Sequence, residues 1–116
     1  MREALAACFL ENNGVRITHR NFRGGRRGEI DLIGYDGEYL VFFEVKFRSS
    51  LSSGFPEEAV TITKQRTICR VADYFRAVYP EEDTGKVRFD VVALTDGPDR
   101  VCHLRWIKNA FEYHGR

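Results

Sequence analysis

The sequence contains few of the residues that mark specialised classes of protein. It has three cysteines, one methionine and one tryptophan among 116 residues. Cys8, Cys69 and Cys102 lie far apart, with no CxxC pair and no cysteine–histidine ligand spacing, which argues against a disulfide framework and a zinc site. We interpret the three cysteines as buried free thiols, which suit a reducing, cytoplasmic compartment.

Long apolar segments are also missing. The longest uninterrupted apolar run, Ala4–Leu10, has seven residues, whereas a transmembrane helix needs roughly 20. This run also lacks the basic start and cleavage site of a signal peptide, so no membrane association is expected. Hydrophobic residues make up 43% of the chain and aromatic residues 13%. That content supports a folded core, and the length predicts one domain over residues 1–116.

A charge excess of either sign is missing too. Lysine and arginine number 18 against 17 aspartate and glutamate residues, a formal net charge of +1. A near-zero sum does not exclude a nucleic-acid partner, because binding depends on where the charges lie. The interval between Glu11 and Glu29 contains no acid and holds Arg16, Arg20, Arg23, Arg26 and Arg27. A second acid-free interval, 59–72, holds Lys64, Arg66 and Arg70. A solvated arginine-rich loop and a basic surface beside a carboxylate site are both compatible with this pattern.

Hydrophobic periodicity predicts an α+β protein with a mixed central sheet and the element order αβββαββ. Helices are expected over 3–12 and 63–78, and strands over 15–20, 29–35, 39–47, 86–94 and 100–107. A loop rich in Ser and Gly is expected over 49–56. The predicted helical core positions are Leu5, Ala6, Phe9 and Leu10, followed by Ile68, Val71, Ala72, Phe75 and Val78.

The dipeptide Asp36-Gly37 between two of these strands is a strong hairpin signal. With these as the two central turn residues, Glu29 lies opposite Glu44, and Asp31 lies opposite Phe42. Because side chains alternate between faces, one face then carries Glu29, Asp31, Ile33, Phe42, Glu44 and Lys46. The opposite face carries an apolar set that must be core: Ile30, Leu32, Val41, Phe43, Val45 and Phe47.

Three carboxylates on one face repel each other and require a compensating cation. Lys46 supplies one positive charge, and a divalent ion such as Mg²⁺, which prefers oxygen ligands, supplies two. A sheet whose outer face is merely polar, with glutamate–lysine cross-strand pairs, is the alternative. The pattern alone does not decide between the two.

These residues carry a family resemblance. The segments Gly28-Glu29-Ile30-Asp31-Leu32-Ile33 and Leu40-Val41-Phe42-Phe43-Glu44-Val45-Lys46 resemble the core of the PD-(D/E)XK nucleases. More closely, the chain resembles the YraN family of small bacterial proteins, related to archaeal Holliday-junction resolvases. Further matching segments lie along nearly the whole chain: 2–7, 20–23, 56–60, 64–65 and 88–92. The resemblance implies an α/β/α, restriction-endonuclease-like fold.

The resemblance also implies roles for individual residues. Asp31, Glu44 and the backbone carbonyl of Val45 would bind Mg²⁺ or Mn²⁺, with Glu3 as a further acidic ligand. Lys46 would position the attacking water, and Gln65 would be a catalytic residue on the second helix. Glu29 would lie just behind the metal ligands. Glu58 is interpreted as a cap or turn residue and Asp90 as part of a structural ion pair.

The function implied by the resemblance is metal-dependent hydrolysis of DNA phosphodiester bonds, selective for branched or junction DNA, by a chain that forms a homodimer. The residues expected to bind DNA phosphates are Arg23, Arg26, Arg27, Arg48 and Lys64. A nucleic-acid-binding module that keeps the fold without catalysis is the main alternative. An interaction protein without a nucleic-acid partner is a third hypothesis, which the arginine-rich interval disfavours.

Overall fold

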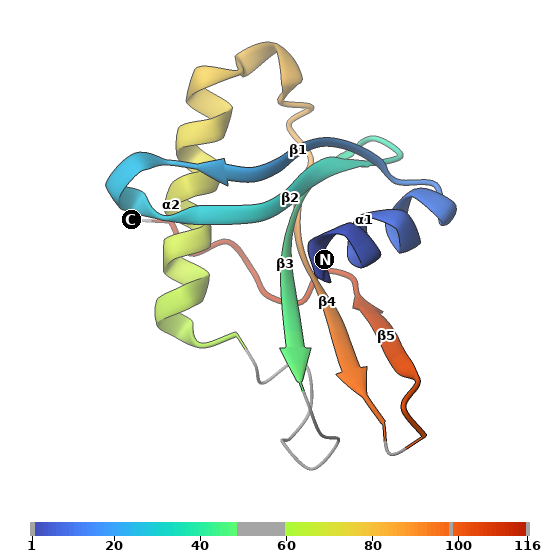
Figure 1. Cartoon of the computed structure of the whole chain (residues 1–116). Coiled ribbons are helices and arrows are strands. Elements are labelled where there is room, and N and C mark those ends of the chain that lie inside the picture. The colour runs from blue at the N-terminus through green and yellow to red at the C-terminus, as the bar shows by residue number, and fades with distance from the viewer. Residues whose placement is uncertain (1, 49–59, 98, 116) are drawn as a thin grey trace.

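The computed structural model describes residues 2–48, 60–97 and 99–115, which form two α-helices and a five-stranded sheet (Figure 1). The predicted α+β class and the order αβββαββ are confirmed. The predicted loop over 49–56 and Glu58 lie outside the described residues. In chain order the elements are α1 (Arg2–Asn12), β1 (Arg16–Arg23), the short 3₁₀ turn η1 (Gly25–Arg27), β2 (Glu29–Asp36), β3 (Tyr39–Arg48), α2 (Ile62–Val78), the 3₁₀ turn η4 (Pro80–Glu82), β4 (Val87–Asp96) and β5 (Cys102–Ile107).

The sheet is mixed, as predicted. Its strands lie in the order β1-β2-β3-β4-β5. Strands β3 and β4 are parallel, and the other neighbouring pairs are antiparallel. A parallel pair requires a crossover connection, and α2 lies in the sequence between β3 and β4. Neither described helix has the length and apolar character needed to cross a membrane.

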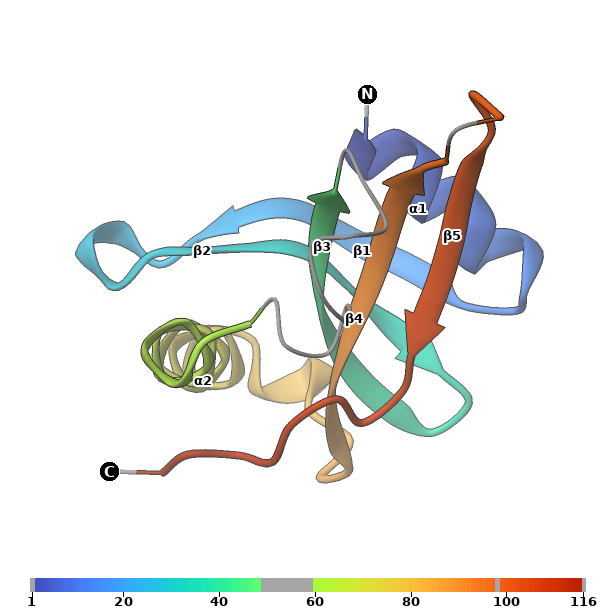
Figure 2. The same cartoon turned by 90° about the horizontal axis from the view of Figure 1, so that it is seen from below.

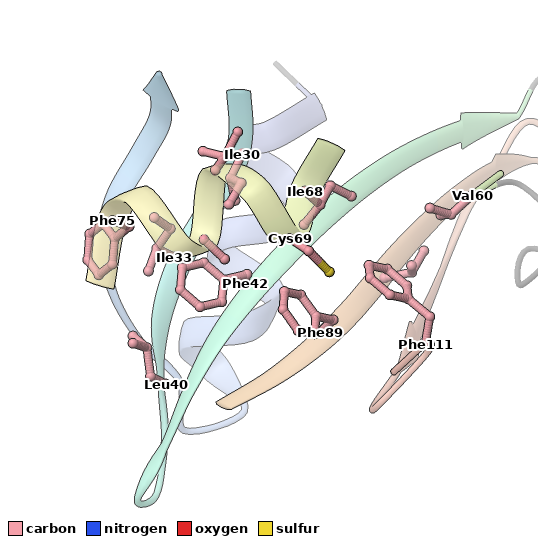
Figure 3. Packing of buried hydrophobic residues seen from close by; sticks show 13 residues of the cluster. Ile30, Ile33, Leu40, Phe42, Val60, Ile68, Cys69, Phe75, Phe89 and Phe111 are labelled. Atoms are coloured by element: carbon pink, nitrogen blue, oxygen red, sulfur yellow. The ribbon is translucent and has the colours of Figure 1, made fainter. Parts of the chain in front are cut away.

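The two helices cover opposite faces of the sheet (Figures 1 and 2). On one face, α1 packs Ala6, Ala7 and Leu10 against buried residues of β2, β3 and β4. On the other, α2 contributes Ile68, Val71, Ala72 and Phe75 to a second cluster, much of which is labelled in Figure 3. The layering implied by the resemblance is therefore present, and the alternative of a sheet with a merely polar outer face is wrong.

Several details of the predicted core are wrong. Cys8, predicted to be a buried thiol, is exposed, and Cys102 is half-buried; Cys69 is buried as predicted. Ile33 and Phe42, predicted on the carboxylate face, are fully buried against α2, because both faces of the sheet are covered. Leu5 is 51% exposed, since α1 turns its small residues toward the sheet. Val78 is 46% exposed because it is the last residue of α2.

The predicted hairpin register is wrong by two residues. Asp36 pairs with Tyr39 and Ile33 with Phe42, so the central turn residues are Gly37 and Glu38. A two-residue hairpin turn needs a positive φ at its first central position, and Gly37 supplies it at 62°. Glu29 is thus not opposite Glu44, nor Asp31 opposite Phe42. A register shift of two residues leaves each side chain on its predicted face. In the observed register, Asp31 and Glu44 are opposite each other, one position beyond the last paired residues, Leu32 and Phe43.

Strand β2 separates from β3 before β2 ends. Its pairing with β3 stops at Leu32 and Phe43, whereas its pairing with β1 continues to Glu29. The two strands and η1 form an arm that extends past α2 (Figures 1 and 2). Because β2 twists as it departs, Ile30 joins the α2 cluster although Leu32 belongs to the α1 cluster. The prediction that Ile30 and Leu32 share one core is wrong for this reason.

Candidate metal centre

The candidate site lies at the fork where β2 and β3 separate. Beyond the pair of Leu32 and Phe43, the backbone of Val45 has no β2 backbone partner. Its N–H instead donates a hydrogen bond of 2.8 Å to Oδ2 of Asp31. Asp31 therefore bridges the fork with its side chain, and its carboxylate is fixed beside β3.

Glu44 occupies the same fork from β3. Only 6% of the residue is exposed, which is unusual for a glutamate unless it is paired. Its Oε2 atom lies 3.6 Å from Nζ of Lys46 and 4.0 Å from Nζ of Lys64. One lysine comes from β3 and the other from the first turn of α2. Two carboxylates and two ammonium groups are thus gathered where the strands diverge.

The electrostatics of the fork favour proton or cation uptake. Burial and the charge of Asp31 raise the pKa of Glu44 to about 7, against the opposing effect of Lys64 and Lys46. Burial also raises the pKa of Asp31, although its hydrogen bond from Val45 acts in the opposite direction. A buried and a half-buried carboxyl group that resist ionising together are typical of sites that bind a cation or exchange protons.

This pKa shift predicts how stability depends on pH. The folded-state pKa of Glu44 is about 7 against 4.5 for the free side chain, so the folded state binds more protons between those values. Its contribution to the free energy of unfolding is present below pH 4.5 and is lost as pH rises toward 7, by roughly 1–3 kcal/mol. Urea unfolding in EDTA at pH 5 and pH 8 measures this, with Glu44→Gln reducing the difference.

The control for that experiment is Glu38→Gln, which changes an exposed glutamate paired with Lys86 on the surface. It should keep the pH dependence of the unmodified protein. If the free energy of unfolding depends on pH equally in Glu44→Gln and Glu38→Gln, Glu44 does not titrate as described.

The donor atoms suit a hard divalent ion. Asp31 and Glu44 offer carboxylate oxygens, and the Val45 carbonyl lies between Glu44 and Lys46 in the chain. Mg²⁺ uses one or two carboxylates and keeps several waters, so this set is sufficient for it. Within the described ranges, no group of three or more His, Cys, Asp or Glu side chains has metal-binding geometry. The predicted cluster of three carboxylates is therefore wrong.

Two acidic residues lie outside that pair. Glu29 is on the arm, where its Oε1 is 3.6 Å from Nη1 of Arg23; it is separated from Glu44 because β2 diverges. Glu3, on the first turn of α1, is near enough for its charge to contribute to the raised pKa of Asp31. It influences the site electrostatically, and its role as a metal ligand stays a prediction.

The side chain of Gln65 forms its hydrogen bonds with residues other than Asp31 and Glu44. Its Nε2 donates to the carbonyl of Val60 at 3.0 Å, and its Oε1 lies 2.7 Å from Nε2 of His114. The backbone N–H of His114 also contacts Sγ of Cys69 at 3.3 Å. The C-terminal segment is therefore fastened to α2, and no feature of the sequence indicated this contact. A catalytic role for Gln65 stays a prediction.

The predicted phosphate-binding residues fall into two groups. Lys64 and Arg48 lie on the elements that carry the site, the first turn of α2 and the end of β3. Arg23, Arg26 and Arg27 lie at the end of the arm, on β1 and η1. Lys64 is predicted to bind a phosphate near the site, and its ammonium lies 4.0 Å from the Glu44 carboxylate; a phosphate-binding role stays a prediction.

The fold and site together define an α+β domain with a mixed sheet covered on both faces, in which two strands fork around a pair of carboxylates flanked by lysines. The description of the matching family model is "Uncharacterised protein family UPF0102", and it covers residues 2–94. The chain belongs to this family, which confirms the YraN part of the resemblance.

Several relatives match over nearly their whole length. A UPF0102 protein of Lachnoclostridium phytofermentans is 43% identical over 98% of this chain and 92% of its own. One from Symbiobacterium thermophilum is 49% identical over 94% of this chain and 91% of its own. One from Chlorobium phaeobacteroides is 46% identical over 94% of this chain and 89% of its own.

Proposed function

We propose that this protein is a metal-dependent nuclease that hydrolyses DNA phosphodiester bonds, with a preference for branched or junction DNA. The observation that carries the proposal is the fork itself, where Asp31 and Glu44 come together with Lys46 3.6 Å from the Glu44 carboxylate. A fold that only binds phosphates has no use for two neighbouring acids beside them, because like charges repel the ligand.

Mg²⁺ or Mn²⁺ would be held by Asp31, Glu44 and the Val45 carbonyl. When bound, such an ion polarises the phosphate and lowers the pKa of a water molecule. The ammonium of Lys46 has a separate role, because it can orient the attacking water and stabilise the negative charge that develops on the phosphate oxygens. Lys64 places a second positive charge beside the same carboxylate, where it can bind the neighbouring phosphate.

The preference for branched DNA is a proposal from the resemblance, supported by the absence of a base-reading motif in the sequence. The arginines bind phosphates, which gives affinity without reading bases. A homodimer would suit a junction, which presents two equivalent strands, and it stays a prediction.

The test is cleavage of labelled linear duplex and junction DNA with Mg²⁺, with Mn²⁺ and with EDTA. Cleavage that needs the metal and is lost in Asp31→Ala is the expected result. DNA binding without cleavage under every metal condition would favour the non-catalytic module instead. Absence of binding at low salt would overturn both functions.

A further inference from the structure

A groove follows the outer side of α2. One hollow of about 330 Å³ is lined by Arg66, Arg70, Asp73, His114 and Gly115. A second, of about 440 Å³, adjoins it through Arg70 and Asp73 and is lined also by Arg27, Tyr74, Ala77 and Tyr113. In Figure 2, α2 is seen nearly end-on between the arm and the C-terminal segment. Arg27 of the arm and residues 113–115 of the C-terminal segment line the two hollows beside the helix.

The groove has a regular basic stripe. Arg66, Arg70 and Tyr74 are spaced four residues apart on α2, so they lie along one side of the helix over about 12 Å. The side of α2 that carries Ile68 and Phe75 is buried in the core. At the far end of the stripe, the guanidinium of Arg27 stacks on the ring of Tyr74 at 4.4 Å, which closes the groove with a third arginine.

The positive charge in the groove is not neutralised within the described residues. Neither Arg66 nor Arg70 forms an ion pair with them; Arg70 donates only to the hydroxyl of Thr67 at 3.3 Å. Asp73, the acid among the lining residues, accepts hydrogen bonds of 2.8 and 3.1 Å from the Tyr113 hydroxyl. Three guanidinium groups against one carboxylate favour a ligand that carries repeated negative charge.

The groove and the candidate site share one helix. Lys64, 4.0 Å from the Glu44 carboxylate, lies two residues before Arg66 and therefore on nearly the opposite side of the helix. A nucleic-acid strand bound in the groove would reach Lys64 and the fork by passing round the N-terminal end of α2. An acidic peptide would also match the charge of the groove, but the fork at the N-terminal end of the same helix favours a nucleic acid as the ligand.

We propose that this groove, formed by Arg66, Arg70 and Tyr74 of α2 with Arg27 of η1, binds the phosphate backbone of the nucleic acid on one side of the cleaved bond. The proposal takes its ligand from the proposed function. It adds a binding surface beyond the fork, on the side of α2 that carries Arg66 and Arg70.

The test is binding measured in EDTA, where cleavage does not interfere. Fluorescence anisotropy follows a labelled DNA strand of about 16 nucleotides and a duplex of the same sequence. Arg66→Glu and Arg70→Glu should each weaken binding of at least one of them about tenfold and lower the slope of log K against log salt by about 0.7–0.9. The matched control is Arg105→Glu, the same charge change on β5 at the opposite edge of the sheet, which should shift affinity less than about twofold.

The outcomes separate this proposal from the proposed function. Unchanged binding in both α2 variants, or equal losses in all three variants, would overturn the groove, even if the protein cleaves DNA. If only the α2 variants lose DNA binding and the unmodified protein never cleaves DNA, the groove is supported and the proposed nuclease activity is wrong. The three substituted arginines are exposed, so matching thermal unfolding midpoints should show that the variants fold.

Discussion

Replacing Asp90 by alanine is expected to lower the free energy of unfolding by about 3–5 kcal/mol, a large share of the roughly 5–15 kcal/mol typical of a domain. Asp90 is 0% exposed. Its carboxylate accepts hydrogen bonds from Nε and Nη2 of Arg88, from Nε1 of Trp106 and from the backbone N–H of Asn109, the shortest 2.8 Å long. The substitution leaves donors from β4, β5 and the following turn without an acceptor. Equilibrium urea unfolding measures the loss.

Two variants sharpen this experiment. Arg88→Ala leaves the buried Asp90 charge without its cation and should cost as much, because Asp90 is the main cause of the raised pKa of Arg88. Asp36→Asn removes the more exposed partner, 2.7 Å from Nη2 of Arg88, and should cost only about 1 kcal/mol. The Arg88→Ala/Asp90→Ala double variant should lose less than the sum of the two single losses. Additive losses would contradict the coupling.

The ion pair at Asp90 shows what the sequence could predict and why. An aspartate in the middle of a strand rich in apolar residues needs a partner, and the prediction of a structural ion pair is confirmed. Its identity as Arg88, two residues earlier on the same strand, follows local alternation. The contact with Trp106 depends on how β5 pairs with β4, which no local pattern specifies.

The elements themselves were predictable because their signals are local. Apolar periodicity and turn residues predict helices and strands whose bounds agree closely with those observed. The run Leu40–Phe43 also carries a signal that the alternation argument overlooks: four consecutive apolar residues are typical of a strand buried on both faces. That run by itself argues against a polar outer face.

The geometry of the fork was only half predictable. The sequence placed Asp31, Glu44 and Lys46 on one face, and an error of two residues in register leaves such a set together. The point at which β2 leaves β3 is set by strand twist and by packing of the arm on α2. That departure separates Glu29 from the pair and creates the hydrogen bond from Val45 to Asp31. The attachment of Gln65 to His114 joins residues 49 positions apart and is likewise tertiary.

Replacing Lys46 by methionine is expected to lower the rate of metal-dependent DNA cleavage by about 10²–10⁴-fold. Methionine keeps the length and apolar stem of the side chain and removes only the ammonium, so the fold should be retained. The lost interaction is with charge that develops during the reaction, so DNA binding in EDTA should change little. Single-turnover cleavage at saturating protein, together with anisotropy in EDTA, separates the two effects.

Lys64→Met is the matched control, because Lys64 and Lys46 approach the same Oε2 atom of Glu44, at 4.0 and 3.6 Å. Removing either charge takes one cation from the Glu44 carboxylate, so a rate that depends only on the protonation of Glu44 should fall similarly in both variants. If Lys46 acts on the water or the phosphate, its variant alone should lose the chemical step, while Lys64→Met should mainly weaken DNA binding and its salt dependence. Equal rate losses with unchanged binding would therefore count against a specific role for Lys46 and leave the two lysines as counter-charges of the two acids.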